Sequence, residues 1–247
     1  YLNGSASNYL SVTDEDGGSL LAGKEEITIS YDEKPDQTGT SWAFYAAPST
    51  ATQLNQNEHY IGALHNSGNI KIERYNNAGA RPASIQQSVG TEWAHIDVVF
   101  KAEETVLYVN GVKRSVVASE HALPDILGDS GIFYIGRANW ANGEGYKGWI
   151  DNFKIYDGAL SDEDLVSAEA AAAAVAADKE ALTLPETVTQ NFILPSQGTN
   201  YSNITWKVSE NHSVEIGDDG YAVTVTRPDL EDETVTFTAT IEMAGQT

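Results

Sequence analysis

The 247-residue chain contains no cysteine. This excludes a disulfide framework, thiolate metal ligands and a thiol nucleophile, so every hydrophobic core must hold without cross-links. Long apolar runs are also missing, since none approaches the roughly 18 residues of a membrane-spanning helix. The first residues show neither the charged nor the apolar region of an export signal. We therefore expect any such signal upstream of Tyr1, and both ends of the chain read as cut from a larger polypeptide.

Basic residues are scarce. Only 14 Lys and Arg oppose 36 Asp and Glu, which gives a formal net charge of −22 at pH 7. A surface of this sign repels phosphate backbones and anionic membranes, so neither nucleic acid nor a membrane is an expected partner. The charge suits a neutral ligand or a divalent cation, and it equally serves solubility alone. The five histidines are scattered, with no pair at i, i+4 spacing, which argues against a transition-metal site.

Short alternating runs of apolar and polar residues, separated by turn residues, extend from Ile27 to Tyr156. This rhythm favours a β-sandwich over βαβ units. The sharpest local signal lies between Thr105 and Val117, where two β-branched and aromatic runs meet at Asn110-Gly111. That dipeptide accepts the two positive φ angles of a type I′ turn, so we expect a hairpin there.

The pattern changes at residues 161–182, SDEDLVSAEAAAAAVAADKEAL. Ser161 as an N-cap, three acids in the first turn and a run of alanines predict a helix. It lacks a wide apolar stripe, so we expect it to pack lightly and to space two domains; a flexible tether is the alternative. Beyond it, about six short strands around Trp206 are typical of a small immunoglobulin-like domain, with Trp206 as a core residue between sheets.

Two segments carry a family resemblance: residues 134–165, YIGRANWANGEGYKGWIDNFKIYDGALSDEDL, and residues 91–113, TEWAHIDVVFKAEETVLYVNGVK. Together with LNGSASNYLSV near the start, they resemble bacterial laminin-G-like, concanavalin A-like jelly-roll domains. Residues 181–247 are similar to small immunoglobulin-like domains of bacterial extracellular enzymes. The resemblance implies an all-β chain with a jelly-roll sandwich at 1–159, a short Ala-rich linker helix at 160–181 and an immunoglobulin-like sandwich at 182–247. The family's earliest strand is missing, which leaves a sheet edge for upstream residues.

Such pairs of domains commonly sit beside catalytic domains of secreted bacterial glycosidases that act on arabinose- and xylose-containing plant polysaccharides. The resemblance therefore implies a non-catalytic carbohydrate-binding module, secreted or attached to the cell surface. Its partners would be a polysaccharide or oligosaccharide and the catalytic domain of the same polypeptide. The alternative is an architectural or adhesive module that packs on a catalytic domain or a host protein and binds no sugar.

A third hypothesis is a glycanase, because some enzymes with this fold place acids at alternating positions of one strand, facing the same side. The acid clusters of this chain, TDEDGG, SDEDLV and LEDETV, lie instead in predicted turns or at a helix cap. Gly-x-Ser-x-Gly, His-Glu-x-x-His and phosphate-loop motifs are absent as well. We therefore expect no catalysis by this fragment.

Sugar sites combine aromatic platforms with a few polar groups, often on loops. The segment ANWANGEGY, residues 138–146, places two large aromatic residues among amides and glycines, directly after an arginine. A structural role, with the tryptophan folded over a sheet edge, is the alternative. The candidate residues in and beside this loop are Arg137, Asn139, Trp140, Asn142 and Tyr146.

Further candidates lie on predicted strands. Trp42 and Tyr45 are three residues apart and so cannot share one face of a regular strand, which leaves at most one of them on a ligand-binding face. Tyr60 and Arg74 lie on two neighbouring strands, where they could add to such a surface together with the adjacent His65 and Tyr75; packing is the alternative for each. Trp93 and His95 share a face by alternation, but their family counterparts look structural, so we assign them to packing.

The resemblance also implies one structural calcium ion near the N- and C-terminal strands, bound in part by the acid of the Ile-Asp element. Asp151 matches that position. Calcium fits the composition, because hard oxygen ligands are abundant and thiolates are absent. Other ligands would come from the N-terminal region, part of which we expect to lie upstream.

Overall fold

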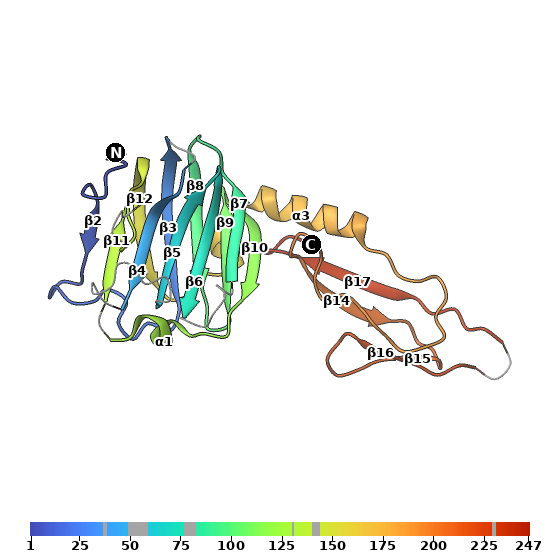
Figure 1. The fold of residues 1–247 in the computed structure, drawn as a ribbon. Helices are drawn as coiled ribbons and strands as arrows, with labels where there is room; N and C mark the ends of the chain where they lie inside the picture. Colours follow the sequence, from blue (N-terminus) through green and yellow to red (C-terminus); the bar gives the residue numbers. More distant parts are fainter. Residues whose placement is uncertain (37–38, 49–58, 77–82, 130, 140–143, 229–230) are drawn as a thin grey trace. The chain divides into compact units, whose positions relative to one another are not determined.

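The computed structural model describes residues 1–36, 39–48, 59–76, 83–129, 131–139, 144–228 and 231–247 (Figure 1). The chain divides into two compact units, Tyr1–Ser161 and Asp162–Thr247. Most elements are strands, and the described helices are α1 (Leu123–Leu127), α2 (Asp162–Leu165) and α3 (Ala168–Ala181). The all-β prediction is confirmed. Among the described residues, no helix is long and apolar enough to cross a membrane.

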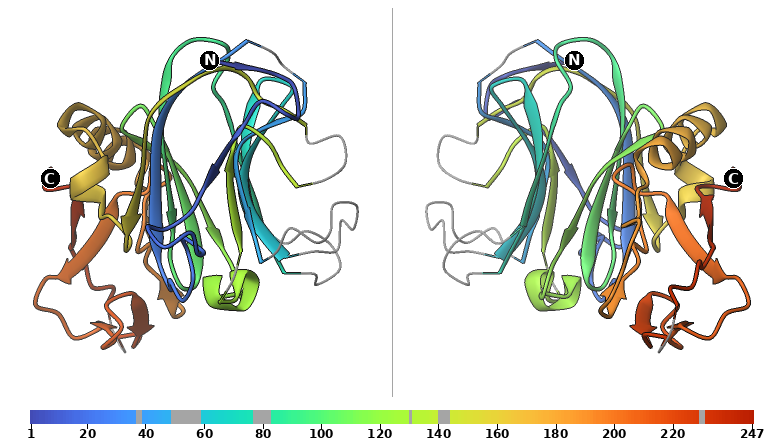
Figure 2. Two further views of the ribbon diagram at one scale, coloured as in Figure 1. Left: turned by 90° about the vertical axis from the view of Figure 1, so that its left-hand side faces the viewer. Right: turned by 90° about the vertical axis from the view of Figure 1, so that its right-hand side faces the viewer.

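The first unit consists of two antiparallel sheets that face each other as layers (Figure 2). Sheet A runs in the order β1 (Leu2–Asn3), β12 (Lys147–Asp157), β3 (Ile27–Pro35), β8 (Ala94–Phe100), β9 (Glu104–Val109) and β10 (Val112–Ala118). Sheet B runs in the order β2 (Leu10–Val12), β11 (Ile132–Ile135), β4 (Ser41–Ala47), β5 (His59–Asn66), β6 (Asn69–Asn76) and β7 (Ala83–Ser88).

The interior between the sheets is mainly apolar because each strand alternates its side chains. Ile27, Ile29 and Tyr31 of β3 point inward toward residues such as Ile61 of β5 and Ile72 of β6, and all are nearly inaccessible to solvent. Each sheet therefore also has an outer face, turned away from its partner sheet. The aromatic groups described below for this unit lie on these outer faces.

The predicted hairpin is confirmed. Strands β9 and β10 pair through Val109 and Val112, with Asn110 and Gly111 at φ 53° and 70°. Both angles are those of a type I′ turn, which matches the right-handed twist of the strands. The Asn110 side chain also accepts a hydrogen bond from the backbone N–H of His95, at 2.8 Å, and so ties the turn to β8.

The second unit begins with helices. The predicted helix is present, but it breaks between α2 and α3, where the Ser167 side chain accepts a hydrogen bond from the Ala170 N–H and caps α3. Helix α3 also packs against the rest of its own unit, more closely than the lightly packed helix expected from the sequence. The Asp178 carboxylate, 2 % exposed, accepts hydrogen bonds from the backbone N–H groups of Asn200 and Ser202. These bonds fix α3 to the β-sheet part of its own unit.

Two small sheets complete this unit. One contains β13 (Phe192–Ile193), β16 (Ala222–Val225) and β15 (Val214–Ile216), and the other pairs β14 (Asn203–Val208) with β17 (Phe237–Glu242). Trp206 of β14 is half-buried, makes an edge contact with Phe237 and donates its indole N–H to the Pro195 carbonyl at 2.8 Å. Trp206 thus lies on the same face of β14 as the buried Ile204 but is itself only partly buried.

Candidate functional site

The outer face of sheet B carries a cluster of aromatic rings, here called the aromatic cluster: Trp42 and Tyr45 of β4, Tyr60 of β5 and Tyr75 of β6. Neighbouring rings lie close, with centroids 5.2 Å apart for Tyr45 and Tyr60, 5.8 Å for Trp42 and Tyr60, and 5.5 Å for Tyr60 and Tyr75. Such contacts add to the stability gained from burial alone. The cluster is separate from the interior core.

A β-bulge in β4 explains how two residues three apart reach the same face. Trp42 lies opposite Leu64, whereas Phe44, two residues later, lies opposite Ala63, only one residue away along the antiparallel β5. The extra residue shifts the alternation, so that Trp42 and Tyr45 both point outward. The expectation that at most one of them faces this side is therefore wrong, because it assumed a regular strand.

Gly62 of β5 provides the space that the Trp42 indole occupies. It lies opposite Tyr45, and a Cβ atom at this position would come within 2.7 Å of Cζ3 of Trp42 and 2.9 Å of the Phe44 carbonyl oxygen. A side chain here would displace the ring. The glycine therefore belongs to the site, although it carries no chemistry of its own.

Two carboxylates accept hydrogen bonds from the polar ends of these rings. The Trp42 Nε1–H donates to Glu144 at 2.7 Å, and the Tyr60 hydroxyl donates to Glu73 at 2.8 Å. The rings themselves are nearly inaccessible, with 1 % of Trp42 and 0 % of Tyr60 exposed. The rings of the cluster are thus buried beneath the surface of this face and are not exposed for stacking on a ligand.

Several residues of the predicted loop lie at the same face. Ala138 packs in the aromatic cluster, and Asn139, which follows it, is 8 % exposed. Glu144 and Gly145, at the other end, lie beside Trp42. Trp140 and Asn142 lie outside the described residues. Both described ends of the predicted loop therefore meet the aromatic cluster.

Arg137 is held at the edge of this face. Its guanidinium lies 4.8 Å from the ring centre of Tyr9 and 5.7 Å from that of Tyr134. It donates hydrogen bonds to the carbonyls of Ala6, at 2.9 Å, and Ala138, at 2.7 Å. Arg137 thus anchors the start of the predicted loop to the N-terminal segment.

The predicted ligand contact of Arg74 is wrong, because its side chain points into the interior, as do Ile70 and Ile72 of the same strand. Its guanidinium donates to the carbonyls of Lys101 (2.7 Å), Ala102 (3.2 Å), Glu104 (3.3 Å) and His121. Burial lowers the pKa of Arg74 to about 10. The alternation NIKIERY already placed this residue on the inward face. Arg74 ties the two sheets together.

Tyr146 and His65 are also internal. The Tyr146 side chain is inaccessible, and its hydroxyl donates to Glu33 at 3.3 Å; burial followed by the Glu33 charge raises the pKa of Tyr146 far above its ordinary value. His65 Nε2 lies 2.8 Å from the same Glu33 oxygen. Neither ring is available to a surface ligand in this structure. Together the three residues form a buried polar link between β3, β5 and the end of the predicted loop.

Asp151 is exposed on the outer face of sheet A, opposite Asp32 of β3. Its carboxylate accepts a hydrogen bond from the Asn152 N–H at 2.8 Å. Within the described ranges, no group of three or more His, Cys, Asp or Glu side chains could hold a metal ion. Calcium also binds backbone carbonyl, amide and water oxygens, so Asp151 as a calcium ligand stays a prediction.

A serine, a histidine and an aspartate lie in line on the same face. Ser30 Oγ is 3.4 Å from His95 Nε2, and His95 Nδ1 is 2.6 Å from Asp32. However, Asp97 lies 3.3 Å from Nε2, and its hydrogen bond, aided by Asp32, raises the pKa of His95 to about 9. The imidazole is therefore protonated at neutral pH and cannot accept a proton from Ser30, as a catalytic base must.

The packing assignment of Trp93 and His95 needs correction. Trp93 is 50 % exposed, and the His95 side chain is 45 % exposed. They do share a face by alternation, but that face is the outer one. Ala94 and Ile96, which alternate with Trp93 and His95 along the chain, are the residues that pack in the core here.

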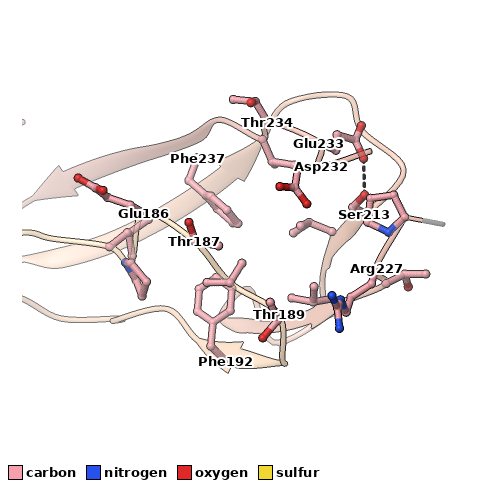
Figure 3. Close-up of a pocket in the computed structure, with 18 residues that line it drawn as sticks. Glu186, Thr187, Thr189, Phe192, Ser213, Arg227, Asp232, Glu233, Thr234 and Phe237 are labelled. Carbon is pink, nitrogen blue, oxygen red and sulfur yellow. Dashed lines mark hydrogen bonds between the residues drawn. The ribbon is translucent and has the colours of Figure 1, made fainter. Parts of the chain in front are cut away.

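The second unit contains a cavity of about 320 Å³ that the sequence did not indicate (Figure 3). Phe192 and Phe237 line one part of it, with ring centres 6.0 Å apart. Arg227 and Glu233 line another part, where the Ser213 hydroxyl donates to Glu233. Its lining thus combines aromatic rings with charged side chains.

Comparisons with protein families agree with this division of the chain. The model of the concanavalin A-like lectin/glucanases superfamily matches residues 3–166, and the model of the atrophied bacterial Ig domain matches residues 168–247. No curated protein is similar enough to this chain to count as a match.

Solved structures share the fold at low sequence identity. The CBM40 module of the Ruminococcus gnavus IT-sialidase, bound to α2,3-sialyllactose, is 14 % identical with a TM-score of 0.54, over 64 % of this chain and 90 % of that chain. The leech intramolecular trans-sialidase, complexed with 2,7-anhydro-Neu5Ac, is 16 % identical with a TM-score of 0.55, over 81 % of this chain and 31 % of that chain. At these identities the likeness concerns the fold.

Proposed function

The chain belongs to the concanavalin A-like lectin/glucanases superfamily, and from this premise we propose that its first unit is a non-catalytic carbohydrate-binding module of a secreted bacterial glycoside hydrolase. The observation that carries the proposal is the outer face of sheet B. There the aromatic cluster, the carboxylates of Glu73 and Glu144 and both described ends of the predicted loop come together. Because the four rings are at most 2 % exposed, we propose that the sugar contacts the polar groups and loop ends that border them and not the rings themselves.

The proposed ligand is a neutral plant polysaccharide that contains arabinose or xylose. Glu144 is a partly exposed carboxylate at the face, Glu73 is buried beneath it, and the whole chain carries a formal charge of −22. A carboxylated sugar would be repelled by this charge, whereas neutral hydroxyls can donate to the Glu144 carboxylate. The likeness to the R. gnavus module, which is bound to a sialylated sugar, supports sugar binding as a class.

The proposed module brings a catalytic domain close to its substrate and catalyses no reaction itself. Weak binding of a polysaccharide would raise the local concentration of substrate around a catalytic domain of the same polypeptide. The protonated state of His95 agrees with this, because it disables the one Ser-His-Asp alignment noted on the described surface. Export from the cell, or attachment to its surface, follows from a polymeric substrate that cannot enter the cell.

Affinity electrophoresis in gels that contain soluble arabinoxylan tests the proposal. Wild-type protein should be retarded, and Trp140→Ala should lose about fivefold or more in affinity if the predicted loop contacts the sugar. Tyr156→Ala is the matched control, since it removes an exposed aromatic ring from β12 of sheet A. Reducing ends should not appear in either sample.

Two outcomes would contradict the proposal. If wild-type protein migrates freely in arabinoxylan, arabinan and xylan gels alike, the architectural or adhesive role is the better account. If reducing ends accumulate with the purified chain alone, the unit is an enzyme. Equal retardation of wild type and Trp140→Ala would remove the loop from the site while leaving sugar binding in place.

A further inference from the structure

A second group of aromatic side chains is exposed on the opposite side of the sandwich. Tyr1 is 58 % exposed, Trp149 of β12 is 42 % exposed, and Trp93, directly before β8, is 50 % exposed. We call these three residues the aromatic row. Tyr1 belongs to the N-terminal segment, Trp149 to β12, and Trp93 directly precedes β8, which β3 separates from β12 in sheet A (Figure 1).

Strand register places the row across the strands of the sheet. Trp149 lies opposite Lys34 of β3, and the neighbouring Glu33 lies opposite Ala94 of β8. Trp93, one residue before Ala94, therefore falls next to Lys34 on the other side. Two strand spacings separate the backbones of Trp149 and Trp93, which is about 10 Å. This is about the length of two pyranose units in an extended chain.

The row is held in place at one end. The Tyr1 and Trp149 rings make an edge contact with centroids 4.6 Å apart, and the Tyr1 hydroxyl donates to Asp36 at 2.9 Å. Edge-to-face contact fixes the orientation of both rings without covering them. The exposed surface is thus partly organised before any ligand arrives.

Polar groups border the row and aliphatic groups do not. Lys34 lies between the two tryptophans, and the next row of the same face holds Asp151, Asp32 and His95 in register. Among the described residues the exposed large aliphatic side chains are Leu10 and Ile193, and neither belongs to sheet A. A protein-docking patch would bring aliphatic neighbours and more apolar area. Flat rings among donors and acceptors suit the C–H faces and hydroxyls of sugars.

We propose that the aromatic row is a second carbohydrate-binding surface, which takes an extended chain of neutral pyranose sugars lying across strands β12, β3 and β8. It is an open face and not a pocket, so it suits a polymer better than a short oligosaccharide. This surface is independent of the aromatic cluster on sheet B. With both faces engaged, the sandwich binds one polysaccharide chain on each side, and avidity on a solid substrate exceeds that of either face.

Retention on insoluble arabinoxylan tests the proposal with the full chain. The double variant Trp93→Ala/Trp149→Ala should lower the affinity for the solid by about fivefold or more. Tyr156→Ala is the control, because Tyr156 is a 37 % exposed ring on the same face of β12. Thermal unfolding should show that all variants fold like wild type, since the replaced side chains are exposed.

A soluble xylo-oligosaccharide separates this proposal from the previous one. The double variant should keep the part of the oligosaccharide binding that Trp140→Ala removes, and Trp140→Ala should keep the part of the retention on the solid that the double variant removes. Unchanged affinity of the double variant for insoluble arabinoxylan would overturn the proposal, as would wild-type protein that is not retained on the solid. Concentration-dependent dimers in sedimentation that vanish in the double variant would assign the row to a second copy of the chain instead.

Discussion

His95 is a protonated link between two carboxylates on the outer face of sheet A. The hydrogen bond to Asp97 raises its pKa to about 9, with Asp32 contributing in the same direction. Burial raises the pKa of Asp32, but hydrogen bonds from Asn152 and His95 outweigh burial and keep it below its ordinary value. Both shifts mean that the charged forms favour the folded state at neutral pH.

We predict a stability loss at alkaline pH. Since the folded-state pKa of His95 lies above that of the unfolded chain, its contribution is complete below about pH 6.5 and is lost as pH rises through about 9. The side chain is 45 % exposed, so solvent screening limits the effect to about 0.5–1 kcal/mol. Urea unfolding at pH 7 and pH 10 should show this drop in wild type. A His95→Gln variant with the same drop would contradict it.

Gly62 is predicted to be intolerant of even a methyl group. Gly62→Ala should cost about 1–3 kcal/mol of unfolding free energy, because the new Cβ would meet the Trp42 ring at 2.7 Å and the Phe44 carbonyl oxygen at 2.9 Å. Gly39→Ala is the control, since no atom lies within 4 Å of a Cβ there. Chemical denaturation measures both. Equal stability of the two variants would show that the indole is not seated on Gly62.

At the scale of elements, alternation along strands is the property that the sequence predicts best. It predicts the strands that meet at Asn110-Gly111, and the same alternation of Ile70, Ile72 and Arg74 indicates an inward-facing Arg74. The bulge in β4 escaped prediction because it depends on pairing with β5, which is not visible in SWAFYAA alone. The packing of α3 escaped prediction for a similar reason, because Asp178 finds its donors at residues 199–202, some twenty positions away.

Arg74 is predicted to tie β6 of sheet B to the β8–β9 turn of sheet A. Arg74→Met should lower the unfolding free energy by about 3 kcal/mol or more, since carbonyls that now accept from the guanidinium would lose a buried donor. Lys71→Met is the matched control on the outer face of the same strand and should change stability by less than about 0.5 kcal/mol. Comparable losses in the two variants, measured by urea unfolding, would refute the inter-sheet role.

At the scale of the whole molecule, composition and family resemblance predicted the fold class and the order of the two units. The net charge reduced the range of expected binding partners, because a formal charge of −22 repels polyanions such as nucleic acids. The site was less predictable. Of the predicted residues, Trp42, Tyr60, Asn139 and Arg137 meet on or beside one face, whereas Tyr146 and Arg74 turn inward. Which face a loop end meets depends on contacts between strands that are distant in the sequence.

The net charge leads to a prediction about salt. Affinity for a neutral xylo-oligosaccharide should change by less than about twofold between 50 mM and 500 mM sodium chloride, because screening acts only on charged partners. α2,3-Sialyllactose should bind more weakly, and salt should improve its binding, because the chain repels anions. Isothermal titration calorimetry measures both. Tight binding of the sialylated sugar that weakens with salt would contradict a neutral ligand.

The central claim is that the outer face of sheet B binds neutral sugar, and the five tryptophans provide its most direct test. In ¹⁵N-labelled protein each indole N–H gives one NMR signal. Titration with a neutral arabinoxylo-oligosaccharide should shift the signal of Trp42, whose Nε1–H donates to Glu144 on that face, and leave that of Trp206 in the second unit unchanged. A titration that shifts Trp206 alone, or no indole signal at all, would contradict the account.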